Sequence, residues 1–91
     1  MNLYDKVLKI DVLDNELLSE LVDEIGYGSR GTINMVVDLL TTLKERIKRG
    51  DKIRLEKTGE ILTLDSFRRL VEDEFTIYVT KAVFKNTVLP D

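Results

Sequence analysis

The chain contains no cysteine and no histidine, and these two absences exclude several kinds of chemistry. Without cysteine there is no disulfide and no thiol nucleophile. Without histidine the usual zinc and transition-metal ligand sets cannot be assembled, and the hydroxyls of Ser19, Ser29 and Ser66 have no imidazole base to activate them. We therefore expect no metal and no cofactor, and we predict that the protein is not an enzyme.

Long apolar runs and a signal-peptide pattern are also missing, so we expect no membrane contact and a cytoplasmic location. The 91 residues, 43% hydrophobic and 34% charged, predict one folded domain over residues 1–91. A chain this short is often marginally stable alone. Self-association into a homodimer or higher oligomer is therefore expected, through an N-terminal strand that has no partner close in sequence.

Charge is distributed unevenly along the chain. Residues 1–27 carry a balance of -5, residues 28–57 one of +4, and residues 58–91 one of -2, which sum to the net charge of -3. This pattern favours binding of an acidic partner by a basic face, or head-to-tail association of two copies of the chain.

The N-terminal segment has two interpretations. Residues 5–13 alternate between apolar and charged side chains, which predicts a strand. The competing interpretation is a helix that begins at Leu3, with Val7 and Ile10 facing inward. We favour the strand.

Two amphipathic helices follow, each with apolar residues at spacings of three and four. Their expected caps are short polar residues and their expected ends are glycines: Asp14 or Asn15 and Gly26 for the first, Ser29 or Thr32 and Gly50 for the second. Lysines and arginines in the last turns of the second helix complement its dipole.

After Gly50 the apolar period changes from that of a helix to that of a strand. We expect a hairpin of residues 52–56 and 60–64, with Gly59 at a positive φ. A short helix capped by Asp65 or Ser66 should follow. The remaining elements are a strand over 75–80 that extends towards Phe84 and an exit tail with Pro90. The predicted fold is α+β, with the two N-terminal helices packed on a small, mainly antiparallel sheet.

Gly26, Gly28 and Gly31 match the letters of the G-x-G-x-x-G dinucleotide-binding pattern. A helix rather than a strand is expected before them, so we interpret them as a helix connection, with a positive φ at Gly26 or Gly28. A weaker alternative is that amides at Gly28 and Ser29, with the side chain of Arg30, hold a phosphate or carboxylate. The protein would then be a small-ligand or nucleotide sponge.

The chain from residue 5 to about 47 resembles the ribbon-helix-helix family of DNA-binding repressors and antitoxins. The resemblance rests on the expected short strand, the run LDNELL at residues 13–18 and the junction GYGSR at residues 26–30. It implies a dimer whose paired strands enter the major groove, where Lys9 and Asp11 read bases. It also implies that Ser29 and Arg30 contact phosphate.

A basic cluster could track phosphates or bind an acidic protein, and comprises Lys44, Arg46, Lys48, Arg49, Lys52, Arg54 and Lys57. The alternative is purely structural, a helix end that complements its dipole followed by an edge strand protected by lysine. Because phosphates dominate affinity for DNA, the acidic N-terminal third favours a protein partner. We therefore predict a small inhibitor or adaptor of the type that phages and mobile elements encode, with a dimeric DNA-binding regulator as the alternative.

Overall fold

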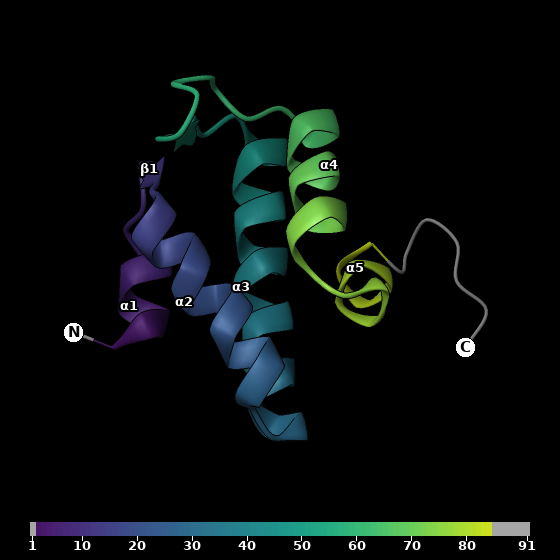
Figure 1. The fold of residues 1–91 in the computed structure, drawn as a ribbon. Helices are drawn as coiled ribbons and strands as arrows, with labels where there is room; N and C mark the ends of the chain where they lie inside the picture. The colour runs from purple at the N-terminus through teal and green to yellow at the C-terminus, as the bar shows by residue number, and fades with distance from the viewer. Residues whose placement is uncertain (1, 85–91) are drawn as a thin grey trace.

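Helix α3, Arg30–Arg49, is the centre of the fold in the computed structural model, which describes residues 2–84. It contacts four other helices: α1 (Leu3–Leu8), α2 (Asn15–Tyr27), α4 (Leu64–Glu74) and α5 (Ile77–Val83). Figure 1 shows α1 and α2 on one side of α3, and α4 and α5 on the other. The predicted apolar stripe of α3 faces these neighbours: its members Val36, Leu40 and Leu43 are fully buried, and Leu39, which was not part of the prediction, is buried beside them.

Helix α1 replaces most of the strand predicted over residues 5–13, so our preference there was wrong. Oδ1 of Asn2 accepts a hydrogen bond from the amide of Asp5 at 2.9 Å and starts the helix. Val7 and Ile10 then turn inward, as the competing interpretation expected. The alternation of apolar and charged residues suits a strand equally well. The segment forms a helix because the helix buries these two side chains against the other helices.

Helices α2 and α3 confirm the two amphipathic helices of the prediction. Oδ1 of Asp14 accepts from the amide of Leu17 at 2.7 Å, and Oγ of Ser29 accepts from that of Thr32 at 3.3 Å. Gly50 ends α3 at φ 105°, in the left-handed region. The first helix continues through Gly26 to Tyr27, one residue past the predicted end.

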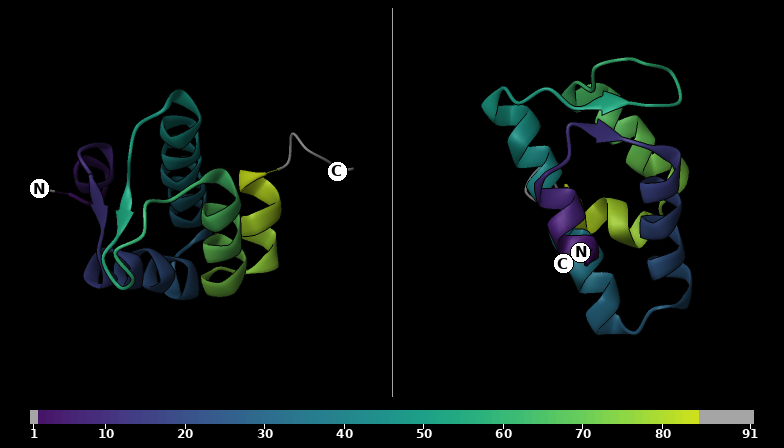
Figure 2. Two further views of the ribbon diagram at one scale, coloured as in Figure 1. Left: turned by 90° about the horizontal axis from the view of Figure 1, so that it is seen from above. Right: turned by 90° about the vertical axis from the view of Figure 1, so that its left-hand side faces the viewer.

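The sheet has two short strands, β1 (Val12–Leu13) and β2 (Arg54–Leu55), and they pair in parallel. The predicted hairpin is present only as a turn: Gly59 has φ 75°, and a single antiparallel bridge joins Arg54 to Ile61. Figure 2 shows that this sheet and the segment around it cover one end of the helical body. Because β1 pairs within its own chain, the argument for dimerisation through an unpaired N-terminal strand no longer holds.

Helices α4 and α5 form the opposite side of the molecule. Thr63, rather than Asp65 or Ser66, caps α4, through a reciprocal pair of hydrogen bonds with Ser66. The strand predicted over 75–80 is wrong, because Oγ1 of Thr76 accepts from the amide of Val79 and starts α5. The spacing of Phe75, Val79 and Val83 is also helical, and this face packs on α3 and α4.

The predicted α+β class is therefore corrected. Helices make up 69% of the described chain, and its only sheet within residues 2–84 has two parallel strands. The mainly antiparallel sheet expected from the C-terminal half did not form, because most of the strand predicted over 75–80 became α5 and the predicted hairpin is reduced to a single bridge. No helix among the described residues is long and apolar enough to cross a membrane. Pro90, predicted to lie in an exit tail, is outside the described residues.

Candidate functional site

The predicted basic cluster is divided by the structure, and Lys44 belongs to its inward part. Only 6% of Lys44 is exposed, and its Nζ donates a hydrogen bond to the carbonyl oxygen of Val83 at 2.9 Å. The same ammonium lies 5.3 Å from the ring centre of Phe84. Burial lowers the pKa of Lys44, opposed by the nearby carboxylate of Glu45. This lysine fastens the end of α5 to α3 and cannot meet a partner.

Arg46 and Arg49 are also engaged within the chain. Nε of Arg46 and Nη2 of Arg49 donate to the same carboxylate oxygen of Asp51, at 3.0 and 2.6 Å. Arg46 donates in addition to the carbonyl oxygen of Leu8 at 3.3 Å. The hydrogen bonds from Arg49 and Arg46 hold the pKa of Asp51 below its ordinary value. Both arginines therefore close the turn after α3.

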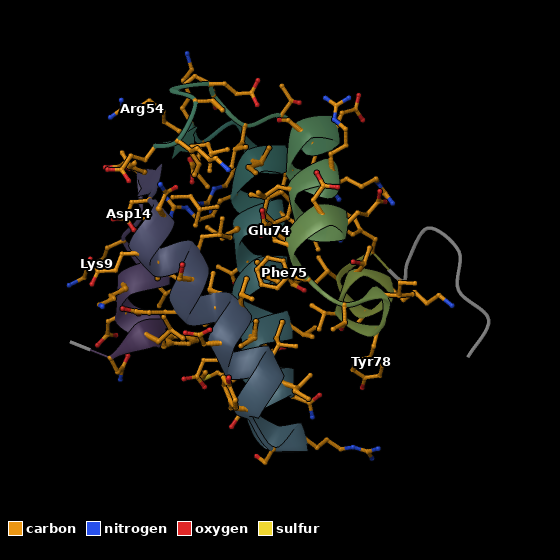
Figure 3. All side chains as sticks on the ribbon, viewed as in Figure 1. Lys9, Asp14, Arg54, Glu74, Phe75 and Tyr78 are labelled. Atoms are coloured by element: carbon orange, nitrogen blue, oxygen red, sulfur yellow. The ribbon has the colours of Figure 1, made fainter. Side chains whose placement is uncertain are left out.

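The outward part of the cluster consists of Lys48, Lys52, Arg54 and Lys57. Lys48 approaches Glu45 at 3.9 Å, the longest of the ion pairs among the described residues. Lys52, Arg54 and Lys57 are exposed and form no side-chain ion pair with any residue of the described range. Figure 3 shows Arg54 projecting on the β1 side of the molecule, away from α4. A partner could reach these four cations, and it could also reach Arg49, whose side chain is 70% exposed although it is paired with Asp51.

Two of these outward cations, Lys48 and Lys52, line an open groove where the end of α3 meets the start of α4. This α3–α4 groove has a volume of about 530 Å³ and is lined by Ile47, Lys48, Gly50, Asp51, Lys52, Ile61, Leu62, Thr63, Leu64 and Asp65. It forms because Gly50 turns the chain out of α3, and Thr63 turns it into α4.

The apolar part of this groove is unusually accessible. Ile61 is 49% exposed and Leu64 is 41% exposed, while Ile47 is half-buried and packs against the core. Single exposed apolar residues are ordinary on a protein surface, but here two of them line one concave region next to free lysines. We therefore take the α3–α4 groove as the candidate functional site.

The sequence analysis missed the apolar half of this site. Lys52 was among its candidates, whereas Ile61 and Leu64 were assigned to a strand. One signal could have found them. Thr63 and Ser66 have the spacing of a capping box, which starts a helix at Leu64 and so removes Leu64 from the predicted strand.

Lys9 and Asp11, the base-reading residues implied by the family resemblance, lie in a different groove. This α1–α2 groove is about 540 Å³ in volume and is lined by Lys6, Lys9, Ile10, Asp11, Val12, Asp14, Glu16, Leu17 and Glu20. Carboxylates outnumber lysines in it, and Lys6 is already paired with Glu20 at 3.1 Å. A phosphate backbone would be repelled there. In addition, residues 3–8 form α1 in place of most of the ribbon that the resemblance implies.

The glycine junction is a tight connection between α2 and α3. Our prediction of a positive φ at Gly26 or Gly28 was wrong, since Gly26 is helical and Gly28 is extended at φ -85°. Gly28 is needed for another reason: an added Cβ would overlap the carbonyl oxygen of Glu24 and come within 2.6 Å of Cγ2 of Thr32. The hydroxyl of Ser29 is used as the cap of α3, and Arg30 is exposed beside it. The cap occupies the amide of Thr32 in the first turn of α3, so that amide cannot also bind the anion proposed for Gly28, Ser29 and Arg30.

No cluster of three or more carboxylates that could hold a metal ion occurs within residues 2–84. No family model matches the chain, and no curated protein or solved structure matches it.

Proposed function

We propose that this protein is a non-enzymatic module that recognises another protein, and that the α3–α4 groove is the surface it uses. The observation that carries the proposal is the exposure of Ile61 and Leu64 in a concave region flanked by Lys48 and Lys52. Burying apolar side chains contributes about 25 cal/mol for each Å² removed from water, and a few such anchors dominate most protein interfaces.

The division of the basic cluster supports a protein partner over a polyanion. A nucleic-acid surface needs several cations that together follow a phosphate backbone. Here Lys44, Arg46 and Arg49 are engaged within the fold, and Arg54 projects away from α4. Of this cluster only Lys48 and Lys52 line the groove, which is a poor match to the row of phosphates on a duplex, whereas a few polar groups are ordinary at the rim of a protein interface. A cytoplasmic location belongs to the same proposal, since nothing in the chain requires an oxidising compartment.

The proposal is tested by capturing partners from the cells that make the protein. The native chain and two variants, Ile61→Asp and Ile77→Asp, serve as baits. Ile77 is a matched control because it is 74% exposed and lies in α5, beyond the opposite end of α4 from the groove. We expect a partner protein that the native chain and Ile77→Asp retain and that Ile61→Asp loses. Equal retention by all three baits would contradict a role for the groove.

The DNA-binding alternative is tested separately with a pool of duplexes at about 100 mM salt, where specific complexes survive. We expect no sequence to be retained. Selective retention of one sequence would overturn the proposal in favour of a DNA-binding regulator.

A further inference from the structure

The charges around the α3–α4 groove indicate which partner it would accept. Lys48 and Lys52 line it, and the side chain of Lys48 is 47% exposed with only a 3.9 Å approach to Glu45. A surface pair at that distance contributes little and is easily exchanged for a carboxylate from outside. Both ammonium groups are therefore available to a partner.

The carboxylates of the groove do not cancel these cations. Asp51 is one of them, but it is bound by two arginines, so that group of three side chains carries a net positive charge. Asp65 is the other, and it lies in the first turn of α4, where the positive end of the helix dipole offsets part of its charge. Two lysines and two aspartates line the groove; once Arg46 and Arg49, which bind Asp51, and Glu45, which faces Lys48, are counted, a small positive balance remains around the apolar lining.

A neighbouring groove has the opposite character. The α2–α4 groove, about 250 Å³ in volume, is lined by Asn15, Leu18, Ser19, Val22, Asp23, Lys57 and Glu74. Its two carboxylates face a single lysine. An acidic segment would be repelled from this groove and attracted to the α3–α4 groove, so charge alone selects between them.

We infer that the α3–α4 groove binds an acidic segment of a partner protein, in which a large apolar side chain is flanked by aspartate or glutamate. The apolar side chain would contact Ile47, Ile61 and Leu64, and the carboxylates would approach Lys48 and Lys52. This inference rests on the proposed function and adds the chemistry of the partner to it.

The test is a selection from a displayed library of short random peptides against the native chain. We expect the selected peptides to combine Leu, Ile or Phe with neighbouring Asp or Glu, and to bind more weakly as salt rises. The variant K48E/K52E should bind these peptides roughly tenfold more weakly, because two rim attractions become repulsions. Replacing the acidic residues of a selected peptide by lysine should restore part of its binding to this variant.

The control is R54E/K57E, which makes the same change in net charge at exposed positions that do not line the groove. It should bind the selected peptides as the native chain does once salt screens long-range attraction. Neutral or basic peptides, or equal losses in the two variants, would overturn the acidic partner. If no peptide is selected above background, the groove is not a docking site for short segments. The capture experiment with Ile61→Asp tests the groove independently of this peptide selection. If capture finds a groove-dependent partner but the selection finds no acidic peptides, only the acidic chemistry of the partner is refuted.

Discussion

A glycine lies at each end of α3, but it permits close packing at the start of the helix and an open groove at the end. At its start, Gly28 lets α2 and α3 approach so closely that no side chain fits, and Ser29 satisfies the first turn. At its end, Gly50 turns the chain outward and a segment of thirteen residues, 51–63, passes before α4 begins. The first end is closed by the chain itself, whereas the second leaves a groove with exposed apolar and cationic side chains.

The comparison teaches that a glycine-rich junction need not be a binding site. Three glycines occur within six residues at the start of α3, yet only Gly28 is required for close packing, since an added Cβ at Gly26 or Gly31 would meet no clash. The single Gly50 at the other end creates the accessible surface, because its positive φ directs the chain away from the helix axis. The predictions below test this contrast, beginning with the largest expected effect.

Gly28→Ala should lower the free energy of unfolding by about 2–3 kcal/mol, because the added methyl overlaps backbone that cannot move easily. Gly26→Ala is the matched control. It lies in α2 with nothing within 4 Å of an added Cβ, so it should stabilise the protein by about 0.5–1 kcal/mol. Urea denaturation of both variants measures the difference. Equal effects would mean that the two helices are not in close contact at Gly28.

Lys44→Ala should cost about 2 kcal/mol, since it removes a buried charged hydrogen bond and leaves the carbonyl of Val83 without that donor. Lys48→Ala, one turn later on α3 but exposed, should change stability by less than about 0.5 kcal/mol. Thermal unfolding compares the two. Similar losses would show that Lys44 does not fasten α5 to α3.

Gly50→Ala should lower stability by about 1 kcal/mol, because alanine is strained at φ 105° although space is available around it. The effect should be smaller than that of Gly28→Ala, in which the obstacle is steric overlap. A larger loss at Gly50 than at Gly28 would reverse the comparison of the two ends. Chemical denaturation curves of the two variants, recorded side by side, decide the order.

Asp51→Asn should have the smallest effect on the free energy of unfolding. It should also change how that free energy depends on pH in the acid range. Arginine hydrogen bonds lower the folded pKa of Asp51 below its ordinary value of 3.8, so its contribution is present above that value and is lost as pH falls through the folded pKa. The stability difference between native chain and variant should thus be greatest near neutrality and shrink in acid. Unfolding curves recorded from neutral to acid pH measure this stability difference. A difference that does not change with pH would contradict stabilisation through the arginine hydrogen bonds of Asp51.

Several elements were predictable because they depend on neighbours in sequence. Helices α2 and α3 have clear apolar periods, and their caps Asp14 and Ser29 bond to amides three residues away. The positive φ of Gly50 and Gly59 follows equally from local turn geometry. At the candidate site, the same reasoning identified Lys52 as accessible but could not pair it with Ile61.

The errors fall where two periods fit the same residues. Residues 75–80 suit a strand by composition, and Phe75, Val79 and Val83 suit a helix by spacing. Such a segment adopts the secondary structure in which its apolar side chains can be buried against the rest of the protein. Here they are buried against α3 and α4, and no extended neighbour was available to pair with a strand.

By itself, the sequence determined the two central helices, their caps and the turns at Gly50 and Gly59, because hydrogen bonds within a few residues specify them. It also determined which chemistries are excluded, since residues that are absent cannot act. Only the tertiary structure decided that Lys44 points inward and Lys48 outward. The partner of Lys44 is Val83, 39 residues away, and a contact at that separation exists only once α5 has packed on α3. The groove depends on the same packing, because its two walls come from segments that meet only in the folded chain.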